Sequence, residues 1–386
     1  MICLFRKVSF WFNFPKDIFH RTRFLFILGL SLITQLSHAQ LFKDSDSTSK
    51  EEGLFILPLL YYTPDTRFAA GAMGVYYFRT GDTLSLAGKN TRLSYIQMLA
   101  DYTQNRQLDV WAAWNIFTNR EDYLFKGDLR YRNFPDRFFG IGNNTPDENM
   151  ERYTYDYFSI KLLGLKQIRK KAFIGLDYQF SYEYNFRFSD DKELARGTIP
   201  GYKGGISSAL GFVFTNDTRD NVVNAWKGHL FEVSSYFNNR SLGSDFEYIN
   251  LNITFNKYRM FAPGHVLAFN AIANLNTEGV PFLDMAKVGN DNILRGYPRN
   301  RYRDLNFTAA QVEYRYPVWG RFGGTVFTGI GEVFNAMDEI KFKLLKYSYG
   351  AGLRYAVNKK ERLNIRVDYG WGRGEQGLYI ALTEAF

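Results

Sequence analysis

A short segment near residue 295 combines an arginine, a glycine and an aromatic residue within a long connection. The segment consists of Leu294, Arg295, Gly296 and Tyr297. An arginine keeps its positive charge and presents five N–H donors, so a buried arginine needs a carboxylate to offset its desolvation. Glycine permits a tight backbone turn, and tyrosine can stack on a neighbouring surface. The segment therefore predicts a loop tip that docks on another part of the chain.

The partners expected for Arg295 lie in strand-like segments that follow it. Gln311 and Glu313 share one face of the segment 305–316 because side chains alternate along a strand. Glu313 is the leading carboxylate partner, and Asp368 in the segment 362–371 is the alternative. A solvated loop arginine remains the other interpretation of Arg295. That interpretation is preferred for the remaining arginines of the same connection, which are Arg299, Arg301 and Arg303.

Residues suited to enzyme chemistry are sparse. Beyond residue 39 the chain has two histidines, His229 and His265, and each opens a predicted strand beside a glycine. No nucleophile elbow, zinc-binding H-E-x-x-H, P-loop or dinucleotide fingerprint occurs. Asp217 and Asp220 could in principle hold calcium, but their spacing does not match a calcium loop, so a solvated turn is preferred. The sequence predicts interfacial histidines, no enzyme, no cofactor and no metal.

The elements that must position these residues are predicted to be β-strands. Sixteen strand-like segments follow one another between about residue 55 and Phe386, and residues 171–184 show the pattern clearly. Apolar residues at every second position there alternate with polar ones such as Asp177 and Glu183. Charges on an inward face suit an aqueous lumen, and an aromatic content of 18% suits a barrel wall. A soluble β-sandwich would also alternate, but it would not carry so many charges on its concave side.

The expected fold is an all-β, sixteen-stranded antiparallel transmembrane β-barrel over residues 54–386. An even strand count places both chain ends in the periplasm and makes the connections after odd strands extracellular. The longest connection, 277–304, follows the eleventh strand. The predicted loop tip lies in it, so we expect this loop between strands 11 and 12 to fold inward.

The predicted first and last strands meet at a seam. The last strand, 376–386, ends in Phe386, a terminal aromatic typical of outer-membrane barrels. The first strand, 55–62, is short and contains Pro58, which lacks a ladder donor and suits an edge. A weak seam could recruit an incoming strand. The alternative is that Pro58 merely marks the start of the sheet.

The N-terminus has the features of an export signal. Residues 1–39 combine five lysines and arginines, an apolar run and a small-x-small site ending at Ala39. The only cysteine, Cys3, lies within this segment. Residues 40–53 are expected to form a short periplasmic tail. The formal net charge of +9, of which the signal supplies +4, is too small to indicate nucleic-acid binding.

Several motifs, in the right order, resemble the bacterial surface antigen superfamily of outer-membrane barrels. This family includes the BamA and TamA assembly factors and the two-partner secretion transporters. Its sixth extracellular loop folds into the lumen and presents an Arg-Gly-aromatic tip, which Leu294–Tyr297 resembles. The periplasmic turn between its strands eight and nine is matched by Asp217, Arg219 and Asp220 through Gly228. Further resemblance is found at Phe139–Asn143, Ile365–Gly370 and Glu384–Phe386.

The resemblance implies function as well as fold. It implies a non-enzymatic barrel of the outer membrane that acts in protein insertion and assembly or in polypeptide translocation. Outer-membrane lipid, lipopolysaccharide, unfolded client proteins and other envelope proteins would be its partners. The family's assembly factors receive clients on periplasmic POTRA domains. The tail 40–53 is too short for one, so we expect a barrel-only member that works with separate periplasmic partners.

One position departs from the family's pattern. In the family, an aspartate within a Phe-x-Asp-x-Gly pattern on strand thirteen also meets the loop arginine. The corresponding stretch here is Phe327–Gly331, with Gly329 in place of the aspartate, so one anchor of the loop is expected to be missing. The alternative function is a gated pore for small solutes or lipid.

Overall fold

The computed structural model describes residues 52–63, 67–78, 80, 94–118, 121–189, 192–340, 342–359 and 362–386. They belong to one compact unit, Glu51–Phe386. The predicted signal peptide and all but two residues of the predicted tail lie outside the described residues. No helix in the described ranges is long and apolar enough to cross a bilayer. The helical elements found there are four 3-10 turns: η3 (Asp147–Asn149), η4 (Arg240–Leu242), η5 (Met337–Glu339) and η6 (Phe342–Leu344).

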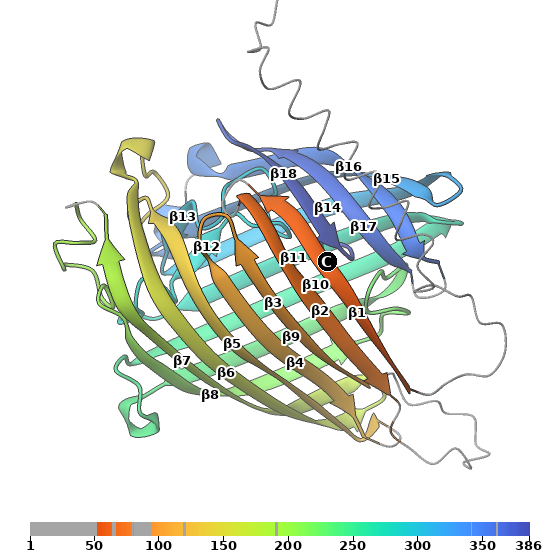
Figure 1. Ribbon diagram of the computed structural model, residues 1–386, viewed down its shortest axis with the longest axis horizontal. Coiled ribbons are helices and arrows are strands. Elements are labelled where there is room, and N and C mark those ends of the chain that lie inside the picture. Colours follow the sequence, from red (N-terminus) through yellow and green to blue (C-terminus); the bar gives the residue numbers. More distant parts are fainter. Residues whose placement is uncertain are drawn as a thin grey trace, which may run out of the picture. The chain divides into compact units, whose positions relative to one another are not determined.

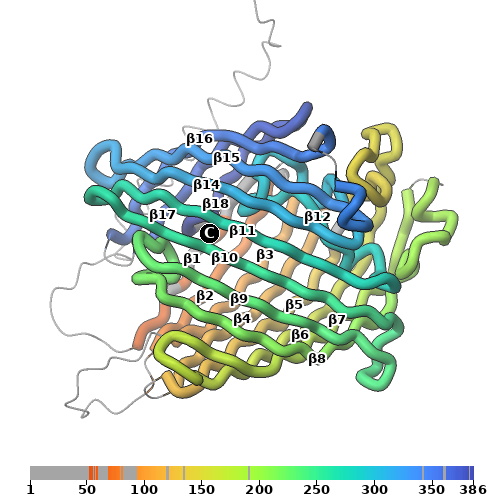
Figure 2. Tube along the Cα trace, turned by 180° about the vertical axis from the view of Figure 1, so that it is seen from behind, coloured from red at the N-terminus to blue at the C-terminus, as the bar shows by residue number. Residues whose placement is uncertain are grey.

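Sixteen strands form one antiparallel sheet in chain order, in which β11 is followed by β14 (Figure 1). The strands are β1 (Glu52–Thr63), β2 (Arg67–Phe78), β3 (Ser94–Thr103), β4 (Leu108–Phe117), β5 (Tyr123–Phe138), β6 (Glu151–Arg169), β7 (Ala172–Phe188), β8 (Gly205–Asp217), β9 (Lys227–Asn238), β10 (Tyr248–Ala262), β11 (His265–Asn276), β14 (Asn306–Trp319), β15 (Phe322–Phe334), β16 (Lys346–Asn358), β17 (Leu363–Trp371) and β18 (Gln376–Leu382). Figure 2 shows the same succession from behind. The all-β antiparallel prediction is confirmed.

The connection between β11 and β14 carries its own small sheet. There β12 (Ala286–Val288) pairs with β13 (Tyr302–Asp304), so the connection doubles back on itself as a hairpin. Sequence periodicity does not reveal strands of three residues. The hairpin fixes the two arms of the loop, and residues 289–301, which include the predicted tip, lie between them.

Several strand boundaries differ from the prediction. β1 has twelve residues and pairs along its whole length with β2, with Pro58 opposite Ala72. The prediction of a short first strand is therefore wrong, and the strand begins at Glu52, inside the predicted tail. β18 ends at Leu382, so the expected strand 376–386 stops four residues early. Proline is tolerated in β1 because β1 is an edge strand of the sheet.

The polarity of the sheet is inverted relative to a soluble protein. In β7, Ile174 and Leu176 are exposed, whereas Asp177 and Glu183 are buried. An apolar residue is likewise exposed in β16, where Leu353 is 64% exposed. Soluble proteins rarely bury charges in preference to apolar side chains. An apolar outer face suits hydrocarbon, and the buried charges on the inner face satisfy one another.

Strands β1 and β18 are the two edges of this sheet. Some of their Cα atoms lie within 8 Å of each other. Among the strands described, no register pairs β1 with β18. An edge strand that has no partner strand offers a row of backbone groups for pairing.

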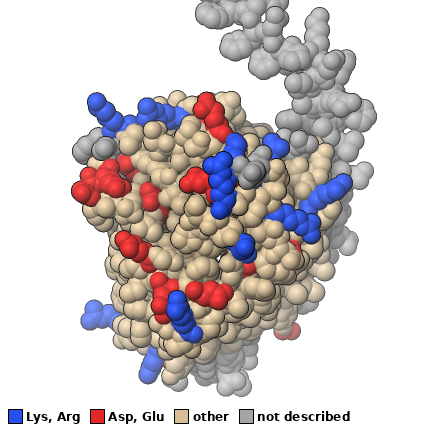
Figure 3. All heavy atoms as spheres, turned by 90° about the vertical axis from the view of Figure 1, so that its left-hand side faces the viewer, with Lys and Arg blue, Asp and Glu red and all other residues tan. Residues whose placement is uncertain are grey.

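The molecular face on the left-hand side of Figure 1 carries charges of both signs. Acidic and basic side chains are interspersed over it (Figure 3). On the part of this face that is described, neither sign forms a continuous field. A surface of this kind gives no electrostatic reason to expect nucleic acid as a partner.

Replacing Leu353 with arginine tests whether the outer face meets lipid. We expect the variant to lose about 2–4 kcal/mol of folding free energy in bilayers, the cost of a mid-membrane arginine on a barrel wall. The measurement is a reversible urea titration in lipid vesicles. Leu242→Arg is the matched control, since Leu242 is an exposed leucine in the connection between β9 and β10. Equal stability of the two variants would contradict a lipid-facing wall.

Candidate functional site

The connection between β11 and β14 is fastened at its base by aromatic packing. Phe282 is fully buried in the core that Phe138 and Tyr153 help to form. Its ring lies 5.9 Å from the Phe138 ring and 5.6 Å from the Tyr153 ring, both edge to face. These partners come from β5 and β6, so the base of the loop packs on the strands of the N-terminal half. Aromatic pairs of this geometry each contribute about 0.5–1.5 kcal/mol beyond their burial.

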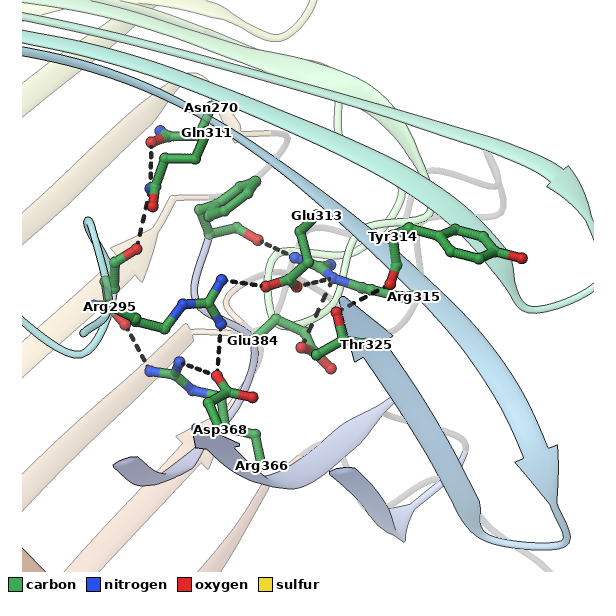
Figure 4. A network of polar contacts seen from close by, with 12 residues as sticks. Asn270, Arg295, Gln311, Glu313, Tyr314, Arg315, Thr325, Arg366, Asp368 and Glu384 are labelled. Atoms are coloured by element: carbon green, nitrogen blue, oxygen red, sulfur yellow. Dashed lines mark hydrogen bonds and ion pairs between the residues drawn. The ribbon is translucent and has the colours of Figure 1, made fainter. Parts of the chain in front are cut away.

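The tip of the loop is held by a fully buried arginine (Figure 4). Nη2 of Arg295 donates to Oε2 of Glu313 at 2.6 Å, and Nη1 donates to Oδ2 of Asp368 at 2.5 Å. Its guanidinium also lies 3.6 Å from the centre of the Phe327 ring. The sequence offered Glu313 and Asp368 as alternative partners. The structure brings both to Arg295 at once, from β14 and β17.

The backbone of the tip is shaped for close approach. Leu294 has a φ of 50° and Gly296 a φ of 121°, both in the region that favours glycine. A Cβ on Gly296 would stand 2.6 Å from the carbonyl carbon of Trp371. No side chain fits in that space, so the position next to Arg295 requires glycine.

The strand under the tip also requires small residues. A Cβ on Gly370 would lie 2.6 Å from the carbonyl group of Arg295. A Cβ on Gly372 would lie 2.6 Å from the ring of Tyr297. Sequence reasoning did not single out these glycines of the wall. Their spacing of two residues, which places them on one face of the chain near the end of β17, was the available signal.

Hydrogen bonds from backbone and tyrosine groups complete the seat of the tip, by which we mean the set of contacts that hold Leu294–Tyr297. They run from Leu294 N to Gln311 Oε1 at 3.0 Å, from Gly296 N to the Tyr379 hydroxyl at 2.9 Å, and from the Tyr297 hydroxyl to the Tyr347 carbonyl at 2.9 Å. Gln311, predicted as a lumen partner of the loop, therefore binds the backbone of the tip. Burial raises the pKa of Tyr297 to about 12, so its hydroxyl remains a donor at neutral pH.

The space left by the missing aspartate is occupied by the loop itself. A Cβ on Gly329 would lie 3.2 Å from Cδ2 of Leu294, and a Cβ on Gly331 would lie 2.8 Å from its Cδ1. Leu294 is fully buried against this glycine surface of β15. At this position the structure has an apolar contact where the family pattern has a carboxylate. Arg295 keeps two carboxylate partners from other strands.

Glu313 and Asp368 belong to a larger buried charge network, which we call the inner-face network. Besides Arg295, its members are Arg315, Arg354, Arg366 and Glu384. Arg315 Nε donates to Glu313 at 2.7 Å. Arg354 donates to Asp368 at 2.5 Å and to Glu384 at 2.7 Å, so it connects these two carboxylates. Sequence reasoning assigned no role to Arg354 or Glu384. Guanidinium groups keep their protons, so the network holds charge in place and does not transfer protons.

The loop also contacts the connection between β5 and β6. Gly142 N donates to the Arg303 carbonyl at 2.7 Å, which forms an isolated antiparallel bridge. Arg301 is 5% exposed and pairs with Asp147 at 2.7 Å and Glu375 at 3.0 Å. The interpretation of Arg301 and Arg303 as solvated loop residues is therefore wrong, because this second contact encloses them. Arg299 is exposed.

The amine of Lys287 is another group of the loop whose pKa is shifted. Burial and the nearby charge of Arg303 lower the pKa of Lys287 to about 7. Its Nζ donates to the carbonyl of Leu283 within the same loop. Partial loss of its proton near neutral pH reduces the buried charge that the loop must accommodate.

The predicted periplasmic turn is paired internally and across the sheet. Arg219 donates to both oxygens of Asp217 at 2.9 Å, and Asp220 Oδ2 accepts from Arg362 at 2.7 Å. These carboxylates are engaged by arginines, which differs from the solvated turn preferred from the sequence. Within the described ranges, no three histidines, cysteines or carboxylates converge as a metal site would require.

The histidines and the predicted seam residues occupy separate places. His229 is bonded to Thr218 and Asn216, and His265 to the Tyr314 hydroxyl. Phe386 lies beyond the end of β18 at Leu382, and its backbone oxygen accepts from Nη2 of Arg315 at 2.8 Å. Pro58, by contrast, lies within the β1–β2 ladder, so the two seam residues have different surroundings.

Comparison with known proteins assigns the family. Residues 77–386 match the Omp85 superfamily domain. The chain belongs to the Omp85 superfamily. A curated Omp85 relative, the outer membrane protein assembly factor BamA of Nitratidesulfovibrio vulgaris (strain Hildenborough), is 26% identical over 161 residues. The match covers 39% of this chain and 20% of that protein, so the chain spans about one fifth of its relative's length.

Solved structures share the fold of this Omp85 chain. BamA from Haemophilus ducreyi lacking POTRA domains 1–3 aligns with a TM-score of 0.57 at 12% identity, over 89% of this chain and 73% of that one. CdiB from Acinetobacter baumannii aligns with a TM-score of 0.55 at 9% identity, over 87% and 60% of the two chains. At these identities the likeness concerns the fold.

Arg295→Ala tests whether the charge pairs hold the loop in this Omp85 chain. Removing one partner of a buried ion pair costs about 3–5 kcal/mol, so we expect the seated loop to open far more often. Trypsin should then cleave at the normally buried Arg301 or Arg303, which can be followed by mass spectrometry of the folded protein in detergent. Arg240→Ala is the control, since its ion pair with Glu247 is exposed. Cleavage at the rate of the control would show that the seat does not depend on Arg295.

Proposed function

We propose that this chain is a closed, sixteen-stranded barrel of the outer membrane that inserts, assembles or translocates polypeptides. In this proposal the β11–β14 loop folds into the lumen as a plug. Periplasmic or outer-membrane proteins deliver unfolded clients to it. Membership in the Omp85 superfamily and the likeness to BamA and CdiB support assembly or secretion as the general activity.

The ion pairs of Arg295 carry the proposal. A buried arginine between two carboxylates contributes little net stability, because desolvation offsets most of the attraction. It does determine where the loop sits, since a displaced loop would leave the Arg295 charge without its two carboxylates, which keep the other arginines of the inner-face network as partners. We therefore infer a seat that keeps the lumen closed at rest and holds the C-terminal strands together.

The edges of the sheet suggest where a client would enter. β1 and β18 lie close, yet the described strands share no ladder there. An unpaired edge can accept a strand from another chain by β-augmentation. Opening at this seam would let a client strand pair with the barrel before it enters the lipid.

The second candidate is a gated pore for small solutes or lipid. The polar inner face favours it, because asparagines line the inner positions of β10 and β11 and bond to one another, as Asn250 does with Asn276 and Asn256 with Asn270. Such a lining would conduct water and solutes if the loop moved. A stable, solute-selective current without any effect on envelope proteins would favour the pore.

Depletion of the protein from its own bacterium tests the assembly proposal. We expect lower levels of other barrel proteins, and their unfolded forms in the periplasm, as measured by proteomics of isolated outer membranes. Unchanged barrel proteins together with altered solute uptake would support the pore. Re-expression of the wild-type chain controls for effects on neighbouring genes.

Tethering the edges tests the seam. Ile56→Cys in β1 and Ile380→Cys in β18, joined by a bismaleimide, should abolish complementation of the depleted strain if the seam opens. The control joins Phe237→Cys and Ile249→Cys, which already face each other in the β9–β10 ladder. Cys3 is the only native cysteine, and it lies in the predicted signal. Full complementation by the edge-tethered protein would contradict seam opening.

A further inference from the structure

The connection between β8 and β9 extends away from the two strands that it joins and contacts a distant part of the sheet. Asp220 Oδ2 accepts from Nη1 of Arg362 at 2.7 Å, and the Arg362 guanidinium lies 3.8 Å from the centre of the Trp226 ring. Arg362 immediately precedes β17. The contact therefore joins the connection after an even-numbered strand to the β16–β17 turn, at the same end of the sheet.

The distance along the sheet shows that residues 218–226 cross open space. β9 and β17 are six strands apart in the sheet order. Neighbouring strands lie 4.7–4.9 Å apart, so the path along the sheet is about 29 Å. Two side chains cannot span that distance. The connection must instead pass across the concave side, at the end opposite the β11–β14 loop.

Side-chain packing holds residues 218–226, the crossing segment, against the sheet. Ala225 is 3% exposed and packs in a cluster with Tyr258 of β10 and Val266 of β11. Trp226 and Phe386 pack against the same cluster. The segment thus touches strands from the middle of the sheet, the β16–β17 turn and the residues after β18.

Internal hydrogen bonds give the segment a fixed shape. Oδ1 of Asn221 accepts from the N–H groups of Val223 and Asn224 at 2.7 and 2.9 Å. Oδ1 of Asp220 accepts from those of Trp226 and Lys227 at 2.9 and 3.1 Å. Asp220 therefore organises the segment with one oxygen and fastens it to Arg362 with the other.

One arginine links this segment to the seat of the loop. Arg315 donates from Nη1 to Oδ1 of Asn224 at 3.4 Å and from Nε to Oε1 of Glu313 at 2.7 Å. The other oxygen of Glu313 holds Arg295. Displacing the crossing segment would deprive Arg315 of a partner and disturb the carboxylate that fixes the loop tip.

We propose that residues 218–226 form a second closure of the lumen, at the end opposite the β11–β14 loop, coupled to that loop through Arg315. The inference rests on the proposed closed barrel with an inward loop. Two closures in series block passage until both are displaced. A polypeptide or partner that moves one closure weakens the other through the shared carboxylate.

Crosslinking of the crossing segment tests the second closure. Asp220→Cys and Arg362→Cys are combined with Arg295→Ala, which releases the loop, and the protein is placed in planar bilayers. Without crosslinker, loss of the Asp220–Arg362 hydrogen bond should raise the mean current about tenfold over Arg295→Ala alone. A cleavable bismaleimide between the two cysteines should suppress that current, and cleavage should restore it in the same channel.

Controls separate the closure from general damage. Arg240→Cys with Glu247→Cys, an exposed ion pair in the β9–β10 connection, receives the same crosslinker and should leave the current unchanged. Heat-dependent mobility in detergent gels verifies folding of every variant. In protein whose β11–β14 loop is shown by tryptic cleavage to be released, equal currents with and without the 220–362 crosslink would overturn the second closure.

The coupling of the crossing segment to the β11–β14 loop through Arg315 is measured separately. Asn224→Ala should increase tryptic cleavage of the β11–β14 loop roughly fivefold, within the usual contribution of one hydrogen bond. Unchanged cleavage would overturn the coupling. These outcomes do not depend on the cellular role. A normal set of barrel proteins after depletion would refute assembly while the bilayer currents still decide the closure.

Discussion

The positive charge of Arg295 is the constraint on which the interior of this molecule depends. A guanidinium that cannot lose its proton has been removed from water. Burial of the guanidinium is tolerated only where carboxylates already lie beside it. The two carboxylates come from strands that are separated in the sheet order. The loop, the two strands and the glycines that let them meet are therefore linked by one continuous set of contacts.

The inverted polarity of the sheet makes such an interior feasible. Apolar side chains on the outer face leave few positions for charges except the inner face, where they gather in mutual contact. The inner-face network joins β14, β16, β17 and the residues after β18. It braces the C-terminal quarter of the sheet, next to the edge at which the described strands lack a ladder. The strands that the network joins thus lie next to the unpaired edge. This arrangement suits a sheet that keeps its shape while one edge strand remains free to pair.

The strands were predictable because their signal is local. Alternation along a single segment identifies a strand, and pairing with the next segment follows from short connections. Arg295 and Glu313 were predictable for a similar reason, since a charge expected inside needs a counter-charge on the inward register. Arg354 and Glu384 were not, because what makes them partners is the register of β16, β17 and β18, which places Arg354 opposite Arg366 and Arg366 opposite Ala381. The buried state of Arg301 likewise depends on Asp147 from a connection over 150 residues away. No property of either segment alone reports that contact.

The complete burial of the Arg295 ion pairs has a consequence for how the loop responds to its surroundings. Mobile ions screen exposed charges over about 8 Å at physiological ionic strength, but they act weakly on pairs that they cannot approach. Changes in external salt therefore act only weakly on the Arg295 ion pairs. Groups that contact the carboxylates directly, such as Arg315 on Glu313, are therefore better placed to influence the tip than the ions of the medium.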